Sequence, residues 1–114
     1  MHMNVEATPE GVVVISLSGR MDIEGAQVVD LKLAAHTATE HGRFVVDLSG
    51  LSFLASIGIR SLLTTAKAVQ KRGGRLVLAG PTAEVDRTLR TAGIDVLIPL
   101  LDDMAAAVAA VGPA

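Results

Sequence analysis

The sequence predicts an α/β fold: a single domain with a mixed β-sheet that opens with an antiparallel hairpin and continues with alternating helices and strands. The chain has 114 residues, which is enough for one hydrophobic core but not for two. Half of its residues are apolar, and most of these are Ala, Val, Leu and Ile, which suit helices packed closely on a sheet. After the hairpin, strand-like and helix-like segments alternate, and this order indicates parallel strands joined by right-handed crossovers.

A hairpin is predicted at the start of the chain. Val5 and Ala7 alternate with polar residues, as expected for a strand with one buried face. The Pro-Glu-Gly sequence at 9–11 is a turn signal, and the apolar run 12–17 that follows it is predicted to be a buried strand.

The middle of the chain predicts two helices, each followed by a strand. An amphipathic helix is predicted at residues 23–40, because its apolar residues recur at helical spacing, and a strand is predicted at 44–48. The next helix is predicted at 56–72 and ends at the glycine pair Gly73-Gly74. A strand at 75–79 completes this part of the sheet.

The last part of the chain predicts two more helices around a short strand. The turn Gly80-Pro81 leads into a helix that ends at Gly93, the usual position of glycine at a helix C-terminus. A short strand is predicted at 96–98. Asp102 is the predicted N-cap of a final Ala-rich helix that extends to Val111.

The composition argues against several classes of function. Nucleic-acid duplexes and acidic membrane surfaces require concentrated Lys and Arg, but the net charge is −2 and no basic cluster exceeds Lys71-Arg72. Base stacking requires exposed aromatic rings, and the chain has two Phe and no Trp or Tyr. The absence of Cys fits a cytoplasmic protein, and no apolar run is long enough for membrane insertion.

No enzyme activity, metal or other cofactor is expected. The histidines His2, His36 and His41 lack a paired carboxylate motif that would complete a metal site. The sequence contains neither the GxxxxGK[ST] pattern that binds phosphates nor the GxSxG pattern of a serine nucleophile. An enzyme acting on a small phosphorylated ligand at the sheet edge is therefore the weakest interpretation, because no nucleophile–base pair can be assembled.

The most informative segment spans residues 44–63, where a buried strand leads into a helix that begins at Ser56. The Ser56 hydroxyl can cap free backbone amides. Alternatively, Ser56 can be phosphorylated, because the positive end of the helix dipole would stabilise the new charge. Gly58 costs a helix about 1 kcal/mol, so it indicates that another backbone or a partner approaches closely. The alternative is that the loop after Gly19 covers the helix there.

Apolar residues flank this serine. Leu54, Ile57 and Ile59 cannot all face the core from one short turn, so at least one is predicted to be exposed as part of a protein-binding surface. Asp22 follows another strand and lies at the same carboxyl edge of the sheet, where the partners of open α/β sheets bind. Capping of the helix that begins near Ile23 is the stronger interpretation of Asp22.

Three runs, GRMD at 19–22, VVDLSG at 45–50 and FLASIGI at 53–59, resemble the STAS domain. This family includes bacterial anti-sigma factor antagonists and the cytoplasmic domains of sulfate transporters. The run GRLVLAG at 74–80 fits the fourth strand of the family. The resemblance covers nearly the whole chain and implies one STAS domain with the STAS fold at residues 4–112.

The resemblance implies a regulatory protein that switches partners. In the antagonists, the serine before the helix is phosphorylated by an anti-sigma factor that is also a serine kinase of the GHKL type. The phosphorylated form releases this kinase, and a phosphatase is a further expected partner. Carried over by position, Ser56 matches the phosphoacceptor. The implied partner-binding residues are Asp22, Leu54, Ala55, Ile57, Gly58 and Ile59.

Ala55 departs from the family pattern. The usual run is close to Asp-Ser-Ser-Gly, whereas this chain has Ala-Ser-Ile-Gly at 55–58. A kinase that reads the missing carboxylate is expected to phosphorylate Ser56 poorly. The change also favours a second interpretation, a non-phosphorylated STAS subunit docked on the ATPase of a lipid-trafficking ABC transporter. The sequence leaves the oligomeric state open between a monomer and a weak dimer.

Overall fold

A five-stranded mixed sheet forms the centre of the computed structural model, which describes residues 1–112. The strands lie in chain order, and β1 pairs antiparallel with β2 whereas every later pair is parallel. This arrangement confirms the predicted mixed sheet with an antiparallel hairpin at one edge. The strands are β1 (His2–Ala7), β2 (Val13–Met21), β3 (Arg43–Leu54), β4 (Arg75–Ala79) and β5 (Leu100–Leu101).

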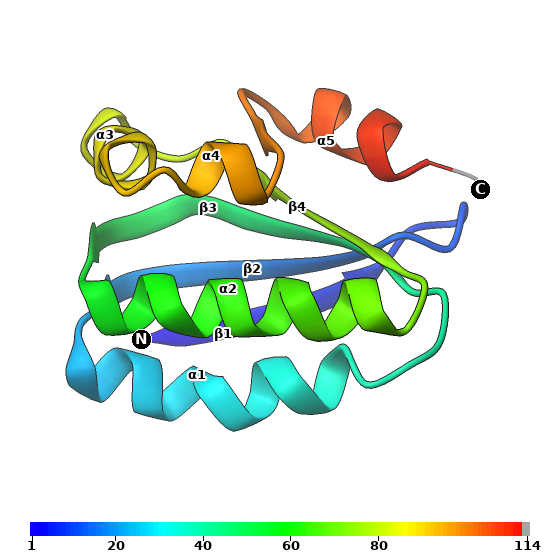
Figure 1. The fold of residues 1–114 in the computed structure, drawn as a ribbon, viewed down its shortest axis with the longest axis horizontal. Helices are drawn as coiled ribbons and strands as arrows, with labels where there is room; N and C mark the ends of the chain where they lie inside the picture. Colours follow the sequence, from blue (N-terminus) through cyan, green and yellow to red (C-terminus); the bar gives the residue numbers. More distant parts are fainter. Residues whose placement is uncertain (113–114) are drawn as a thin grey trace.

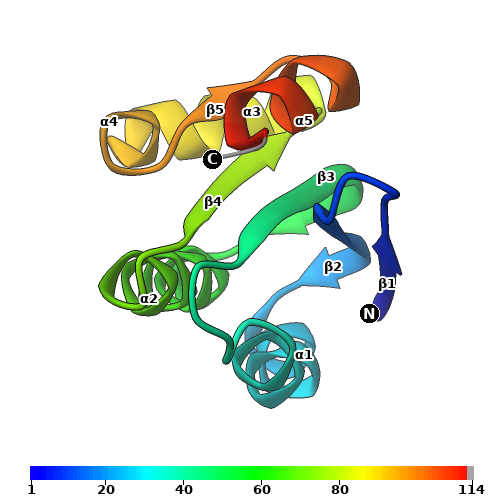
Figure 2. The ribbon, with the colours of Figure 1, turned by 90° about the vertical axis from the view of Figure 1, so that its right-hand side faces the viewer.

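The helices cover both faces of this sheet. Two of them, α1 (Ile23–His36) and α2 (Ser56–Lys71), lie side by side, with α1 nearer β1 and α2 nearer β4 (Figures 1 and 2). Buried residues of α1 and α2 share one core with those of α3 (Ala83–Thr91) and α4 (Ile94–Leu97). On the opposite face, α5 (Met104–Val111) packs in a second, smaller core with β3 and β4. None of the helices within residues 1–112 has the length and apolar character that a membrane crossing requires.

The first helix is shorter than the predicted span 23–40. It ends at His36, with Thr37 as its C-cap: the backbone N–H and the hydroxyl of Thr37 both donate to the Leu33 carbonyl oxygen, at 3.1 and 2.7 Å. The weak helix formers Thr37, Thr39 and Gly42 do not favour a further turn. The polar residues that follow lie in the connection to β3.

The strand predicted at 44–48 is longer, because β3 continues to Leu54. The Asp-Leu-Ser-Gly run at 47–50 forms an irregularity within the strand: the Ser49 N–H donates to Asp47 Oδ1 at 3.0 Å, and the register against β2 shifts between Ser16 and Ser18. Such a bulge lets a strand bend without ending. The additional residues carry β3 to the start of α2.

The strand predicted at 96–98 is wrong, because residues Ile94–Leu97 form α4 and the strand follows at Leu100–Leu101. A short apolar run fits either structure on periodicity alone. Here Ile94 and Ile98 are both buried, at helical spacing, and the Ile98 N–H donates to the Ile94 carbonyl oxygen at 2.8 Å. Val96 and Leu97 are exposed.

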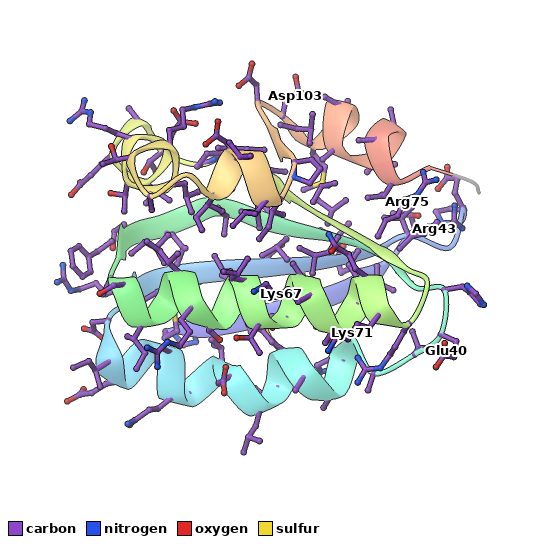
Figure 3. The ribbon with its side chains drawn as sticks, in the orientation of Figure 1. Glu40, Arg43, Lys67, Lys71, Arg75 and Asp103 are labelled. Carbon is purple, nitrogen blue, oxygen red and sulfur yellow. The ribbon has the colours of Figure 1, made fainter. Side chains whose placement is uncertain are left out.

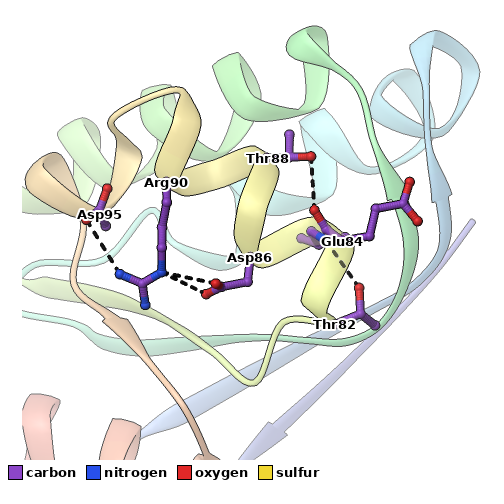
Figure 4. Close-up of polar contacts among 7 residues, drawn as sticks. Thr82, Glu84, Asp86, Thr88, Arg90 and Asp95 are labelled. Atoms are coloured by element: carbon purple, nitrogen blue, oxygen red, sulfur yellow. Dashed lines mark hydrogen bonds and ion pairs between the residues drawn. The ribbon is translucent and has the colours of Figure 1, made fainter.

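Side-chain caps and an ion-pair network define the helices at the end of the chain. The N-cap of α5 is Asp103, not the predicted Asp102; its Oδ1 accepts from the Ala106 N–H at 2.8 Å (Figure 3 labels Asp103). Arg90 of α3 binds Asp86 at 3.1 Å and Asp95 of α4 at 3.6 Å (Figure 4). The hydrogen bond and charge of Asp86 raise the pKa of Arg90 above its ordinary value. The network links α3 to α4 across Gly93.

Candidate functional site

The candidate site lies where β2 joins α1 and β3 joins α2. These parallel strands are neighbours, and their last residues, Met21 and Leu54, are paired in register. The Ala55 N–H donates to the Met21 carbonyl oxygen at 2.9 Å, which ties the two junctions together. The structure therefore brings Asp22 and Ser56, the residues that follow these contacts, to the same carboxyl edge of the sheet, where α/β folds bind ligands and partners.

Ser56 is the first residue of α2 and not its cap, so the capping interpretation of Ser56 is wrong. Ala55 occupies the N-cap position with extended backbone, and its carbonyl oxygen accepts from the N–H groups of Gly58 and Ile59, at 2.9 and 3.1 Å. Ser56 is exposed, and its hydroxyl has no hydrogen-bond partner among residues 1–112. The fold thus does not use the Ser56 hydroxyl, which remains free to react.

The N-terminus of α2 lacks the features that normally stabilise a helix start. The Ala55 methyl group cannot accept a hydrogen bond, and the first turn of α2 contains no acidic residue. Within the described chain, the N–H groups of Ser56 and Ile57 have no protein acceptor. An anionic group at this position would find free donors and the positive end of the helix dipole.

Asp22 caps α1, which confirms the stronger interpretation from the sequence. Its Oδ1 accepts from the Gly25 N–H at 2.9 Å, and its Oδ2 lies 3.8 Å from Arg20 Nε. The carboxylate keeps 42% of its side-chain exposure, so capping does not remove it from the surface. Asp22 can therefore hold α1 in place and contact a partner as well.

Gly58 and Leu54 are buried within the chain. An added Cβ at Gly58 would lie 2.7 Å from Leu54 Cδ1 and 2.9 Å from Met21 Cγ. The close approach that the sequence indicated is therefore made by side chains of this chain, and it brings Met21, two residues after Gly19, against the first turn of α2. Leu54 is 5% exposed, so it supports the site from below and offers little surface to a partner.

The exposed apolar residue beside Ser56 is Ile57. It keeps 38% of its exposure, whereas Ile59 is half-buried and packs against the core. At least one exposed residue among the three flanking Ser56 was expected, and Ile57 confirms it. Ile57 also borders a hollow of about 230 Å³ between α1 and α2, whose other lining residues are Ala26, Gln27, Asp30, Arg60, Ser61 and Thr64. Ser61 donates a hydrogen bond to Asp30 Oδ1, which ties the two helices together in this hollow.

Arg20 and Phe53 belong to the site and were missed in the sequence. The Arg20 guanidinium lies over the Phe53 ring, 4.4 Å from its centroid. Such stacking holds a cation in a fixed place while leaving it charged. The signal that could have indicated this pair is that Phe53 is one of two aromatic residues in the chain and immediately precedes the site.

No metal-binding group was found at the site. Among residues 1–112, no three His, Asp or Glu side chains gather in a way that could hold a metal ion. The chemistry available at this edge is that of a reactive hydroxyl, a carboxylate, a guanidinium and an apolar surface.

Comparisons with known proteins agree on the fold. A family model described as "Mlab, STAS domain" matches residues 4–102. BtrV of Bordetella bronchiseptica, assigned as an anti-sigma factor antagonist, is 29% identical over 101 residues, which cover 89% of this chain and 87% of BtrV. The crystal structure of an anti-sigma factor antagonist from Mycobacterium paratuberculosis is 31% identical with a TM-score of 0.81, and the match covers 96% of this chain and 92% of that one.

More distant structures share the fold. SpoIIAA in its unphosphorylated form is 20% identical with a TM-score of 0.66, over 90% of this chain and 89% of that one. The phosphorylated form of Bacillus SpoIIAA is likewise 20% identical with a TM-score of 0.65, over 87% of this chain and 90% of that one. With a family model that matches most of its length, the chain belongs to the STAS domain family.

Proposed function

We propose that this chain is an anti-sigma factor antagonist that binds an anti-sigma factor kinase of the GHKL type and is switched by phosphorylation of Ser56. One observation carries the proposal: Ser56 is an exposed serine whose hydroxyl the fold does not use, at the start of an uncapped helix. The similarity to BtrV and to the Mycobacterium paratuberculosis antagonist supports the choice of partner class. The role is regulatory, and we place it in the cytoplasm.

The partner surface that we propose is centred on Ile57. This side chain stands exposed beside Ser56, and Asp22 and Arg20 provide charges of both signs across the junction. An exposed apolar residue among polar neighbours is typical of the centre of a protein contact. Ala55 and Ile59 would extend the contact along the start of α2, while Leu54 and Gly58 fix its shape from within the core.

Phosphorylation would act on this surface in two ways. The phosphate would add a charge of about −1.5 to −2 beside Ile57, so a partner that buries this side chain would have to desolvate the phosphate. Within the free chain, the uncapped N–H groups at the start of α2 would stabilise the same phosphate. Both effects favour the released state of the phosphorylated protein.

The experiment that tests the proposal begins with the protein recovered from its own host, during growth and under stress. Intact mass and phosphopeptide mapping should find one phosphate on Ser56 that changes with the condition. Binding of the purified chain to the anti-sigma factor kinases of that host is then measured by calorimetry. Ser56→Asp should weaken binding, while Ser49→Asp, a matched change at another exposed serine, should not. An unmodified chain in every condition would contradict the switch.

The absent carboxylate at Ala55 supports a second candidate, a STAS subunit that docks on the ATPase of a lipid-trafficking ABC transporter without phosphorylation. The same exposed Ile57 would then serve a permanent contact. Ala55→Asp distinguishes the candidates: a cognate kinase should phosphorylate the variant faster than the parent chain. In the second candidate the chain would instead copurify with an ATPase, and Ser56→Ala would leave that association unchanged.

A further inference from the structure

The edge strand β1 presents an open row of backbone groups. It pairs with β2 on one side only, in an uninterrupted register from His2 opposite Ser18 to Ala7 opposite Val13. On its other side no strand of the described chain follows, and β1 contains no proline, lysine or bulge of the kind that protects sheet edges. Such an edge can accept a further strand.

An apolar stripe on α1 lies beside this edge. The buried face of the helix contains Ala26, Val29 and Leu33, yet Val28 and Leu31 on its outer side are 49% and 81% exposed. Val28 lines a hollow together with Met1, which places this side of α1 toward β1. The charged residues Glu24 and Lys32, exposed one turn before and one turn after Val28, share this side of the helix with the apolar stripe. Ala35, exposed one heptad after Val28, continues the stripe.

The sequence of β1 is self-complementary when two copies run antiparallel. If Asn4 lies opposite Asn4 of a second copy, then His2 faces Glu6 of that copy, and Met3 faces its Val5. Each of these pairs occurs twice because of the two-fold symmetry. His2, Asn4 and Glu6 share one face of the strand, where the Asn4 amide donates to Glu6 Oε1 at 3.1 Å, while Met3 and Val5 pack toward the core. An imidazole N–H opposite a carboxylate and an apolar pair are both favourable cross-strand neighbours.

We infer that this chain forms a two-fold symmetric homodimer in which the β1 strands pair antiparallel about Asn4. The sheets of the two copies then become continuous, and the two α1 helices lie on the same face of the joined sheet, beside the junction. The stripe of Val28, Leu31 and Ala35 on one α1 meets the same stripe on the other. The occupant of the open edge is thus a second copy of this chain, because the pairing that fits the edge is with itself.

The dimer leaves the Ser56 end of the candidate functional site accessible, whereas Arg20 and Asp22 line the same hollow as Val28 and lie closer to the junction. Viewed along the strands, α1 lies between α2 and the β1 edge, so the N-terminus of α2 is on the far side of α1 from the dimer junction (Figure 2). The inference does not rest on the proposed function. A monomeric protein could still be switched at Ser56, and a dimer could exist without any kinase.

The first test is the mass of the intact chain in solution. Sedimentation velocity over a series of concentrations from low to high micromolar should show the 11.8 kDa chain converting to a species of twice that mass. Leu31→Glu should raise the dissociation constant by about tenfold, because it places two carboxylates in the contact between the α1 helices. Leu97→Glu, at another exposed leucine on α4, should leave it unchanged.

Disulfide crosslinking tests the register, and the chain suits this method because it contains no cysteine. In the inferred dimer Asn4 lies opposite itself, within the Cα separation that a disulfide spans, so Asn4→Cys should form a crosslinked dimer on mild oxidation. Glu6→Cys alone should not crosslink, whereas a mixture of His2→Cys and Glu6→Cys chains should crosslink to each other. A dimer in which Glu6→Cys crosslinks and Asn4→Cys does not would overturn the inferred register.

A charge exchange provides the last test. His2→Glu places like charges opposite Glu6 at both ends of the junction, and the dissociation constant should rise by about tenfold. The double variant His2→Glu/Glu6→Lys restores opposite charges and should recover the parent affinity. A parent chain that remains monomeric at every concentration, with no crosslink at Asn4, would overturn the inference.

Discussion

Replacing Gly58 by alanine tests whether the fold or a partner requires this glycine. The added Cβ would lie 2.7 Å from Leu54 Cδ1 and 2.9 and 3.1 Å from Met21 Cγ and Sδ. Met21 is 0% exposed and Leu54 is 5% exposed, so neither side chain can move aside into solvent. Because interiors are packed to near-crystalline density, the first turn of α2 must shift outward or these side chains must leave their preferred rotamers.

Two opposing contributions determine how much Gly58→Ala changes the free energy of unfolding. Alanine is favoured over glycine inside a helix by about 1 kcal/mol. Overpacking of a filled core typically costs about 1–3 kcal/mol. The net effect should be a loss of about 1 kcal/mol in the free energy of unfolding, with a fall of about 4 °C in the melting temperature. Without the clash, the same substitution would stabilise the protein by about 1 kcal/mol, so the sign of the effect decides the question.

The change in the free energy of unfolding is measured by urea unfolding of four proteins: the parent chain, Gly58→Ala, Met21→Ala and the double variant. Met21→Ala should itself cost about 2–5 kcal/mol through the cavity that it leaves. In that background the Gly58→Ala change should become stabilising, because Leu54 can turn into the vacated space. A stabilising effect of Gly58→Ala in the parent chain would refute the reasoning, and the glycine would then be needed for the approach of a partner.

Substitutions at five further positions give distinct expected results. Asp22→Ala should lower the free energy of unfolding by about 1 kcal/mol in urea, whereas Asp22→Asn should retain most of the stability, because Asn caps helices as well as Asp does. Asp103→Ala should lower the free energy of unfolding by a similar amount, whereas Asp102→Ala should have little effect. Equal losses of stability in the two variants would contradict the assignment of Asp103 as the N-cap of α5. Ala55→Asp should raise the melting temperature, because the carboxylate can accept from the free amides of α2. Ile57→Glu should leave the melting temperature within about 2 °C of that of the parent chain, as expected for a surface substitution. The same variant should show no partner binding in calorimetry. A large loss of stability would instead place the Ile57 side chain in the core.

The mixed sheet and the longest helix, α2, could be predicted because their signals are long and unambiguous. The buried strands at 12–17, 44–48 and 75–79 are rich in Val and Leu, and the helix predicted at 56–72 agrees with α2 (Ser56–Lys71) to within one residue. In these segments the periodicity of apolar residues and the terminating glycines agree with each other. A fold can be predicted from its sequence where such local signals agree with each other.

The errors lie where a local signal has two physical solutions. The run 94–98 is too short for its period to distinguish helix from strand, and only the burial of Ile94 and Ile98 together decides for α4. The Asp-Leu-Ser-Gly run at 47–50 has turn chemistry, but pairing with β2 on one side keeps it within the sheet as a bulge. Neither outcome can be read from neighbouring residues alone, since both depend on contacts with distant elements.

The candidate site was located in the sequence, but the cap of α2 was placed one residue too late. Ser56 was considered for the cap of α2, and a shift of one residue gives the cap position to Ala55 instead. Helix boundaries have this uncertainty because the residues on either side of the start differ only in backbone conformation. The rarity of Phe53 could have marked it as a site residue, but its contact with Arg20 could not be predicted, because that contact depends on how far β2 and β3 extend beside each other.

The missing cap of α2 connects the stability of this fold with its proposed regulation. Asp22, Thr82 and Asp103 cap α1, α3 and α5 with their side chains, yet α2, the longest helix of the described chain, has an alanine at its N-cap. A side-chain cap contributes about 1 kcal/mol, so its absence leaves a helix start with unsatisfied donors. A phosphate on Ser56 would supply the acceptor that Ala55 does not. The phosphate that disrupts a partner contact would therefore also stabilise the free chain. Phosphorylation would thus shift the binding equilibrium toward release both by destabilising the bound state and by stabilising the free state.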